Sequence, residues 1–520
     1  MFRAMKLFAH WNRLAAGGAF LGLALALLAP TRVAAQAAPG ATADATPPGS
    51  PRRPSIVFIL ADDLGYGDLG CYGQTRIKTP NIDALAAEGM RFTSFYAGST
   101  VCAPSRATLM TGRHSGHNRI RGNADIGLEA ADVTLGQVLR GAGYATAAVG
   151  KWGLGEEGSA GVPSAQGFEE WFGYLNQTHA HDYYPTYLYR TAADGRSARI
   201  PILENAEGRR GKYADDYFTE VALNFARINA PDHGNAYKPF FLYLAYTIPH
   251  ANNELGQKTG NGMEVPTDAP YSGELWPAVE RNKAAMITRM DADIGRLMKK
   301  LEELKIAKNT LVIFASDNGP HREGGVNPNF FHSAGSLRGI KRDLYEGGIR
   351  VPFIAHWPLV IPKGATSDLP VAFWDVLPTL AEIARTPAPR EIDGKSFLGA
   401  LQGYAVTNVH EFLYWEFHEG GFSQAVRMGR WKGVRHGVDA PLELYDLQTD
   451  LAEKQNVAEA HPAEVAKITD YLKTARTEDP KWPARTAAEN AAGKAQAAAR
   501  AAKKAEAANP ARPTAPAPAK

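Results

Sequence analysis

Two pairs of adjacent oxygen-donor residues stand directly after apolar runs of the chain. Asp62 and Asp63 follow the run SIVFIL, and Asp317 and Asn318 follow the run TLVIFA. Carboxylates packed side by side repel each other unless a cation lies among them, and an oxygen-only set suits Ca²⁺ or Mg²⁺ better than Zn²⁺. Each Asp could instead cap a helix or a turn. Two tandem pairs at two strand ends favour the cation.

Basic side chains follow two further apolar runs. Lys151 comes after the run at residues 144–149, and His250 comes after the run at residues 240–246. All four runs are typical of buried strands. In open α/β sheets, ligands bind beyond the carboxyl ends of the strands. The sequence therefore predicts one site at that edge of a sheet, with oxygen donors and basic side chains together.

The elements that must position these residues alternate along the chain. Helical patterns over residues 81–90, 134–142 and 283–304 separate the apolar runs. This order is typical of an α/β domain with a large, mostly parallel sheet flanked by helices. From about residue 408, three strand-like runs precede a helical pattern over residues 462–477. We therefore expect a smaller C-terminal α+β subdomain.

Composition and charge exclude several classes of protein. The 520 residues are 45% hydrophobic, 10% aromatic and 21% charged, which argues against wholesale disorder, a collagen repeat and a disulfide-rich mini-protein. The net charge is +3, but residues 1–37 carry four basic and no acidic side chains, and residues 481–520 carry eight basic and two acidic ones. The body between these ends is acidic, so we expect no nucleic-acid partner.

The two ends differ in composition from the body. Residues 1–37 combine a basic leader, an apolar run and small residues, as in a signal peptide. The run is shorter than the roughly 20 residues of a transmembrane anchor, so we expect no anchor. Residues 38–53 are expected to be a linker, and residues 481–520 a disordered tail rich in Ala, Lys and Pro. The protein is therefore expected to be exported, to the periplasm or the extracellular space.

Cys71 and Cys102 are the only cysteines, and in an oxidising compartment they could form a disulfide. The surroundings of Cys102 indicate another fate. This residue begins the segment CAPSRATLMTGR. A cysteine-phosphatase loop would need Arg where this chain has Thr108, so the sequence disfavours a thiolate nucleophile.

The segment at residues 102–113 resembles the C-x-P-S-R-x-x-x-x-T-G-R motif of the type I, formylglycine-dependent sulfatases at every fixed position. The resemblance extends over roughly residues 54–475 and includes the stretches GKWGLG, SDNGPHREGG and LRGIKRDLYEGGIRVP. It implies the alkaline-phosphatase-like sulfatase fold. In that fold we expect a catalytic domain over residues 54–400 and a C-terminal subdomain over residues 401–480.

This resemblance implies a modified cysteine and a metal ion. A formylglycine-generating enzyme would oxidise Cys102 to formylglycine (3-oxoalanine). The hydrated aldehyde would supply one oxygen to attack sulfur and a second to eject the sulfate. Ca²⁺, with Mg²⁺ as the alternative, would lower the pKa of the attacking hydroxyl. Its ligands would be the modified residue, Asp62, Asp63, Asp317 and Asn318.

The resemblance also implies roles for four basic residues. Arg106 would anchor the hydrated aldehyde. Lys151 and Lys341 would hold sulfate oxygens, because an ammonium group is a compact donor for an oxyanion. His250 would protonate the leaving alcohol, since its ordinary pKa lies close to working pH.

One position departs from the family pattern. Many family members carry a His two residues after the Lys of the GKW motif, where it acts as the base that breaks down the sulfated intermediate. This chain has Gly153 there. His179 and His181 are candidates to replace the missing base, and a substrate-binding or purely structural role for them stays open.

The predicted activity is hydrolysis of a sulfate ester. The stretch around His179 and His181 resembles arylsulfatases and N-acetylgalactosamine-6-sulfatases, so a sulfated sugar is the expected substrate and aryl sulfates are surrogates. Loops over residues 156–235 and 251–282 are expected to line its site. Three alternatives stay open: a phosphatase or phosphonate monoester hydrolase of the same superfamily, a sulfated-glycan-binding protein without catalysis, and a cysteine hydrolase.

Overall fold

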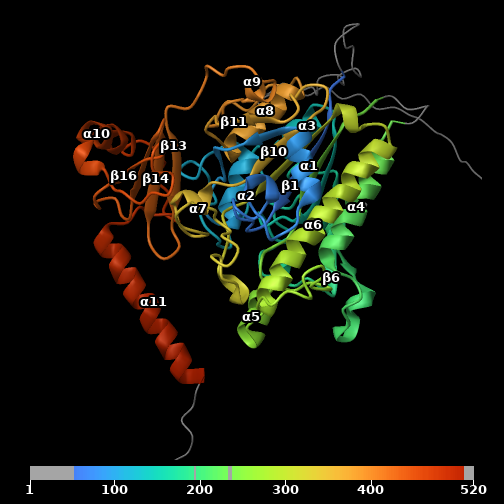
Figure 1. Cartoon of the computed structure of the whole chain (residues 1–520), viewed down its shortest axis with the longest axis horizontal. Coiled ribbons are helices and arrows are strands. Elements are labelled where there is room, and N and C mark those ends of the chain that lie inside the picture. The colour runs from blue at the N-terminus through green and yellow to red at the C-terminus, as the bar shows by residue number, and fades with distance from the viewer. Residues whose placement is uncertain (1–51, 193–194, 232–236, 509–520) are drawn as a thin grey trace, which may run out of the picture. The chain divides into compact units, whose positions relative to one another are not determined.

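The computed structural model describes residues 52–192, 195–231 and 237–508, and Figure 1 shows their arrangement. The expected signal peptide over residues 1–37 lies outside these ranges, as does all but the end of the expected linker. Within these ranges, no helix is both long enough and apolar enough to cross a bilayer.

A ten-stranded mixed sheet forms the centre of the fold, with the order β11-β2-β10-β9-β1-β8-β4-β5-β6-β7. The strands β9, β1, β8, β4 and β5 are parallel neighbours, whereas β10 and β6 pair with them in the antiparallel direction. The predicted large, mostly parallel sheet is therefore confirmed. The bounds are β1 Ser55–Ala61, β2 Met90–Phe92, β4 Ala145–Lys151, β5 Glu170–Tyr174, β6 Tyr187–Thr191, β7 Ser197–Pro201, β8 Phe240–Ala245, β9 Thr310–Ser316, β10 Phe353–His356 and β11 Ala365–Ser367.

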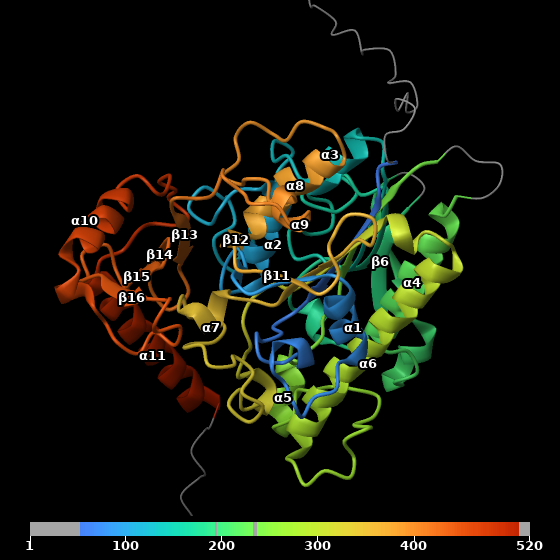
Figure 2. The same cartoon turned by 45° about the horizontal axis from the view of Figure 1, so that its top comes forward.

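Two hydrophobic cores cover the two faces of this sheet, because successive side chains of a strand point in opposite directions. In β1, Ile56 and Phe58 belong to one core, and Val57 and Ile59 belong to the other. All four are buried, as expected for a parallel strand covered on both faces. Figure 2 shows the flanking helices: α1 (Pro80–Glu88), α4 (Ala214–Asn229) and α6 (Ala278–Glu303) on the Val57 side, and α2 (Cys102–Thr111), α3 (Leu135–Gly141) and α8 (Val376–Ile383) on the Ile56 side.

The three predicted helices correspond to α1, α3 and α6, with small shifts at their ends. α6 begins earlier than predicted, directly after Pro277, and its methionines Met286 and Met290 are buried in the core. Asp291 of the same helix accepts hydrogen bonds from the backbone N–H groups of Asn81 and Ile82 at 3.0 and 2.8 Å. A side chain from α6 therefore satisfies the free N–H groups at the start of α1.

A four-stranded antiparallel sheet of order β13-β14-β15-β16 follows the large one. Its bounds are β13 Leu413–Phe417, β14 Ser423–Met428, β15 Trp431–Arg435 and β16 Glu443–Asp446, and α10 (Pro462–Tyr471) accompanies it. Trp415 packs against Tyr96 and Trp374 of the main body, with ring centroids 5.1 and 5.4 Å apart. The predicted smaller C-terminal α+β unit is confirmed. An aromatic cluster joins it to the part of the chain that contains the large sheet.

Shorter elements connect these parts. β3 (Phe95–Tyr96) pairs with β12 (Val371–Ala372) in a two-stranded sheet. The remaining short helices are α5 Asn253–Thr259, α7 Glu346–Ile349 and α9 Leu398–Leu401, with 3₁₀ turns η1 Gly70–Tyr72, η2 His179–His181, η3 Leu203–Gly208, η4 Ala307–Asn309, η5 Glu323–Gly325, η6 Phe373–Asp375 and η7 Ala458–Ala460.

The tail differs from the expectation of disorder. α11 spans Ala487–Ala508, and Thr486 and Glu489 exchange hydrogen bonds at its start, in the manner of a capping box. Asn490 fixes the first turn, because its side chain bonds both the N–H and the carbonyl of Phe422. Helix propensity of the Ala-rich stretch and this anchor explain the order. Residues 509–520 lie outside the described ranges.

A buried ion cluster holds the small sheet against the segment that follows Lys341. The Nζ of Lys432, on β15, donates to Glu346 of α7 at 2.9 Å and to Glu453 at 3.3 Å. Glu346 also accepts from Arg350 at 2.9 Å and from the hydroxyl of Tyr96 at 2.7 Å. The side chains of Lys432, Glu346 and Glu453 are fully buried. Such a cluster is stable only while every charge keeps its partner.

Replacing Lys432 by Met should therefore destabilise the protein strongly. The change leaves Glu346 and Glu453 as buried carboxylates without their ammonium partner, which costs about 3–5 kcal/mol. Urea unfolding followed by fluorescence measures the loss. Lys473→Met is the matched control, because Lys473 pairs with Asp470 at the surface. Equal unfolding midpoints for the two variants would contradict the role of the cluster.

Candidate active site

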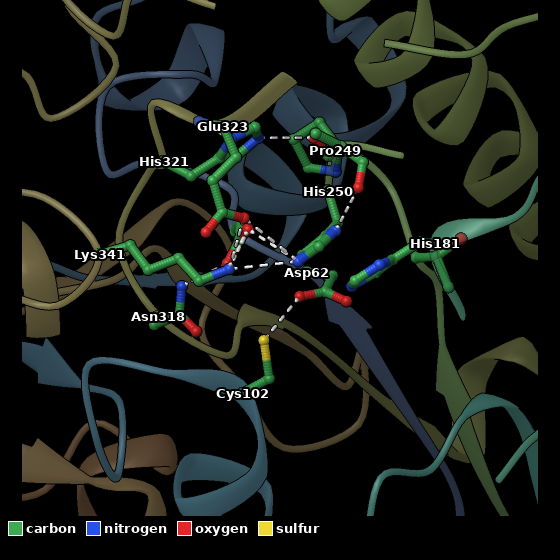
Figure 3. A network of polar contacts seen from close by, with 12 residues as sticks. Asp62, Cys102, His181, Pro249, His250, Asn318, His321, Glu323 and Lys341 are labelled. Atoms are coloured by element: carbon green, nitrogen blue, oxygen red, sulfur yellow. Dashed lines mark hydrogen bonds and ion pairs between the residues drawn. The ribbon is translucent and has the colours of Figure 1, made fainter. Parts of the chain in front are cut away.

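Four neighbouring parallel strands bring the predicted polar residues to one edge of the sheet. The strands β9, β1, β8 and β4 lie side by side, so their carboxyl ends meet. Figure 3 shows part of the resulting cluster, in which Asp62, His250 and Asn318 lie near Cys102. Its members are buried and come from the strand ends or the loops that follow: Asp317 and Asn318 after β9, Asp62 and Asp63 after β1, His250 after β8, and Lys151 at the end of β4.

Cys102 and Arg106 lie one turn apart at the start of α2, so their side chains share one face of the helix. The guanidinium of Arg106 donates to Asp317 Oδ2 at 2.8 and 3.0 Å and to the carbonyl oxygen of Lys151 at 2.7 Å. These bonds tie α2 to the ends of β9 and β4. The start of a helix carries a partial positive charge, so Cys102 stands where a negative group is stabilised.

Each buried carboxylate of the site has a buried cationic partner. Lys151 Nζ donates to Asp62 Oδ2 at 2.5 Å, and Lys341 Nζ donates to Asp63 Oδ2 at 2.8 Å. Burial alone would raise the pKa of Asp62, but Lys151 holds this pKa well below its usual value. Burial would lower the pKa of Lys341, and Asp63 instead keeps it well above the usual value. The two lysines are therefore charged.

The described residues of the site include a group that could hold a metal ion. Asn318 donates its amide N–H to Asp63 Oδ1 at 2.7 Å, while its own Oδ1 is buried and has no hydrogen-bond partner among the described residues. One ligand atom each from Asp62, Asp63, Cys102 and His250 lies within 4.8 Å of the others. A buried carbonyl oxygen without a partner beside two carboxylates is a site for a cation.

Asp63 and Asp317 complete this arrangement in different ways. Asp63 adopts a φ of 66°, a left-handed conformation that costs free energy in most residues and that Asp tolerates better. Asp317 Oδ1 accepts from the Asp63 N–H at 3.1 Å, and its Oδ2 faces Arg106. Asp317 therefore orients Asp63 and pairs with the charge of Arg106.

The environment of Cys102 disfavours a thiolate. Its Sγ donates to Asp62 Oδ1 at 3.3 Å. Burial and the charge of Asp62 hold the pKa of the thiol well above its usual value, whereas a nucleophilic cysteine needs a lowered pKa. Cys102 and Cys71 are both free thiols, so the possible disulfide is not formed. The chemistry of a cysteine hydrolase is therefore not supported.

The imidazole of His250 is oriented by its hydrogen bonds. Nδ1 lies 2.8 Å from the carbonyl oxygen of Ala251. A carbonyl only accepts, so Nδ1 carries the proton and Nε2 is the basic nitrogen. Nε2 faces Lys341 Nζ at 3.2 Å. Burial and the charge of Lys341 hold the pKa of His250 well below its usual value, so the ring is neutral and shares a proton with the lysine.

Three residues that the sequence analysis did not single out hold the His250 loop. The Tyr183 hydroxyl donates to the carbonyls of Thr247 and His250 at 2.8 and 2.6 Å. His321 Nε2 bonds the Pro249 carbonyl at 3.0 Å (Figure 3). Asp215 accepts from the Thr247 N–H at 2.9 Å and from its hydroxyl at 2.7 Å. His321, within SDNGPHREGG, carried the only sequence signal.

Glu323 is a further residue beside the site that the sequence analysis did not name. Its Oε2 lies 3.3 Å from Lys341 Nζ and 3.6 Å from His250 Nε2, and its Oε1 pairs with Arg342 at 2.6 Å. Burial opposes ionisation of this carboxyl, but Lys341 brings its pKa down to about 2. Glu323 therefore adds a fixed negative charge that orients Lys341.

The structure separates the two candidate histidines. The ring of His181 stacks on that of His250, with centroids 5.0 Å apart and planes at 12° (Figure 3), and His181 Nδ1 bonds Glu254 at 3.0 Å. His181 lines the cavity over Cys102. His179 instead packs on Tyr187 at 4.4 Å and is not among the cavity-lining residues. Burial lowers the pKa of His179 to about 4.

A cavity of about 720 Å³ opens above Cys102, a size typical of small-molecule sites. The wall of this cavity is mostly polar, with amide, hydroxyl and carboxylate groups from the segments after β4 and β5 and from the loop after α2. The polar and charged lining residues are Asn123, Asp125, Glu129, Glu156, Ser159, Asn176, Gln177, Thr178, His181, His250, Asn253, Glu323, Lys341, Arg342 and Lys481.

Family comparison connects this chain with a known group of hydrolases. The family model described as Sulfatase matches residues 54–386, and the model described as N-sulphoglucosamine sulphohydrolase, C-terminal, matches residues 340–479. The chain therefore belongs to the sulfatase family, whose members named below are sulfuric ester hydrolases, and it is an enzyme of that class.

Several relatives of this chain are sulfatases. The chain is 28% identical to the N-acetylgalactosamine-6-O-sulfatase of Bacteroides thetaiotaomicron, covering 82% of this chain and 94% of that protein. It is 34% identical to the N-acetylgalactosamine-6-sulfatase of Canis lupus familiaris, with 75% of each chain covered. Human arylsulfatase A is 32% identical, with 81% of this chain and 87% of that protein covered.

Among solved structures, the chain resembles Ps i-CgsB in complex with k-i-k-neocarrahexaose. The TM-score is 0.71 at 27% identity, covering 87% of this chain and 99% of that one. The phosphonate monoester hydrolase SpPMH from Silicibacter pomeroyi shares the fold, with a TM-score of 0.57 at 20% identity and coverage of 81% and 94%.

Asp215 should make stability depend on pH. Burial raises its pKa to about 7, whereas an Asp in an unfolded chain titrates near ~3.9. A raised carboxyl pKa stabilises the fold at low pH, and this contribution is lost as the pH rises to about 7. Relative to Asp215→Asn, the parent should lose roughly 2–3 kcal/mol of unfolding free energy between pH 5 and pH 8.

Urea unfolding at several pH values measures this difference. Asp470→Asn is the control, because the Asp470 side chain is exposed at the surface and its replacement should leave the slope of the parent unchanged. Parallel pH profiles for the parent and Asp215→Asn would contradict the assignment.

Proposed function

We propose that this enzyme hydrolyses a sulfate ester of a carbohydrate. The observation that carries the proposal is the cavity above Cys102, whose lining residues are mostly polar or charged, with amides, carboxylates and hydroxyls beside the apolar Ile126, Leu128 and three alanines. Such groups pair with sugar hydroxyls, whereas a steroid or a plain aryl group would need an apolar wall. The N-acetylgalactosamine-6-sulfatase names of two relatives agree with a sulfated amino sugar as one candidate.

The proposal includes a formylglycine at position 102 and a divalent cation, with Ca²⁺ favoured and Mg²⁺ as the alternative. A formylglycine hydrate supplies a hydroxyl nucleophile in place of a thiol, and a cation supplies a positive charge that favours its ionised form. The oxygen atoms of Asp62, Asp63, Asp317 and Asn318 would hold the cation together with the modified Cys102, and the buried Oδ1 of Asn318 supports this role.

The basic residues of the chain would bind the sulfate and move protons. Lys151 and Lys341 carry full charges beside Cys102, so they can bind sulfate oxygens, and Arg106 holds position 102 from one helical turn away. His250 shares a proton with Lys341 across 3.2 Å. We infer that this pair delivers the proton to the leaving alcohol oxygen.

The proposal extends to location and domain organisation. The leader at residues 1–37 supports export to the periplasm or the extracellular space, where sulfated polysaccharides would be encountered. The division into a catalytic domain over residues 54–400 and a C-terminal subdomain over residues 401–480 is part of the same proposal.

The test is a substrate panel with protein co-expressed with a formylglycine-generating enzyme. Sulfated mono- and oligosaccharides, including N-acetylgalactosamine 6-sulfate, are assayed beside 4-nitrophenyl sulfate and a phenyl phosphonate ester. We expect release of sulfate from at least one sugar, loss of activity in Cys102→Ala and after removal of divalent cations, and a mass deficit of about 18 Da on the Cys102 peptide. Preference for the phosphonate, or no turnover by fully modified protein, would overturn the proposal.

Replacing His181 by Ala should slow the second half of the reaction. Its Nδ1 bonds Glu254, so the other ring nitrogen is free to accept a proton in the cavity. Loss of a general base costs about 100-fold or more in rate. We expect a first-turnover burst of 4-nitrophenol followed by slow turnover. His179→Ala is the matched control, because His179 packs on Tyr187. Equal steady-state rates for both variants and the parent would contradict this role.

A further inference from the structure

Gln177 occupies the space that a side chain at position 153 would fill. Gly153 and Gln177 lie beyond the ends of the parallel neighbours β4 and β5, where the pairing continues through Trp152 N–H to Tyr174 O at 3.0 Å and Gly153 N–H to Leu175 O at 2.9 Å. Gly153 has a φ of +76°, and a Cβ there would lie 2.2 Å from Gln177 Nε2. A side chain at position 153 would therefore push the Gln177 amide out of its present place, and the positive φ also favours glycine there.

The side-chain amide of Gln177 has a hydrogen-bond donor without an acceptor among the described residues. Its Nε2 is buried and has no partner among the described residues, which is costly unless a ligand supplies one. The neighbouring amide differs: Asn176 donates to Glu156 at 3.2 Å and accepts from the His179 N–H at 2.8 Å. Gln177 and Gly153 line the cavity that contains Cys102 and His181. The donor without a partner therefore belongs to a side chain of the cavity wall.

The surroundings of Gln177 favour a neutral acceptor over a sulfate. The cationic groups of the site stand beside Cys102 and pair with the strand-end carboxylates. The residues on either side of Gln177 in the chain, Asn176 and Thr178, are neutral and also line the cavity. Asn176 bonds the acidic Glu156, a further lining residue that would repel an anion. A hydroxyl or ring oxygen of the alcohol that carries the sulfate matches this wall.

We propose that Gln177 determines specificity by donating its amide N–H to an oxygen of the sugar that is being desulfated. The proposal rests on the proposed function and adds the residue that selects the alcohol part of the substrate. Gly153 is a positioning residue that acts through Gln177. Because it has no side chain, the Gln177 amide can occupy the space beside it.

The experiment compares kcat/KM for the hydrolysed sugar sulfate with kcat/KM for 4-nitrophenyl sulfate, which has no sugar oxygens. Gln177→Ala should lower the ratio of sugar to aryl activity about tenfold, the effect of one lost hydrogen bond. Gly153→Ala should lower it similarly, because the new Cβ displaces the amide. Gly158→Ala is the matched control, since Gly158 has a φ of +83° and open space around its Cβ position; it should keep the parental ratio.

A double variant separates displacement of Gln177 from backbone strain. If Gly153→Ala acts by displacing the amide, it should not lower the ratio further in a Gln177→Ala background. An unchanged ratio in Gln177→Ala, or an equal loss on both substrates, would overturn this inference while parental turnover of the sugar upholds the proposed function. A parent that hydrolyses aryl sulfate and no sugar sulfate would overturn the proposed function and this inference with it.

Discussion

Charge compensation at the carboxyl ends of four parallel strands is the constraint on which the site depends. Burying a carboxylate or an ammonium group costs several kcal/mol, and only a partner at hydrogen-bond distance offsets this cost. Here each acid has its own cation, in the pairs Asp62–Lys151, Asp63–Lys341 and Asp317–Arg106. These pairs fix both ammonium groups beside the strand-end carboxylates.

Because these charges must keep their partners, further hydrogen bonds and ion pairs hold the loops that carry them. His250 lies among cations that favour its neutral form, and it depends on Tyr183 and His321 to keep its basic nitrogen aimed at Lys341. Lys341 in turn precedes α7, which the buried Lys432 ties to the small sheet. The C-terminal sheet is therefore part of the support of the active centre, although none of its strands lines the cavity above Cys102.

The residues at the strand ends could be predicted from the sequence, because short patterns along the chain determine where they lie. Apolar runs that end in Asp62 or Asp317 predict buried strands with polar carboxyl ends. Cys102 and Arg106 were identified by the resemblance of their segment to a known motif, and the helical start that puts both on one face was seen only in the structure. The order of the strands in the sheet could not be predicted from short stretches of sequence. The location of the site could still be predicted, because ligands bind beyond the carboxyl ends of parallel strands in any order. The capped helix α11 was missed because its anchor, Asn490, bonds residues far away in sequence.

The positions of the side chains in the segment after β5 could not be predicted from patterns in the sequence. His179 and His181 are two residues apart and chemically identical in the sequence, but a 3₁₀ turn sends one ring onto Tyr187 and the other onto His250. Gln177 gains its place only because β5 pairs with β4 in a register that sets it over Gly153. The chemistry of the site thus depends on strand ends, whereas the fit to one particular alcohol depends on loops whose contacts arise only in the folded chain.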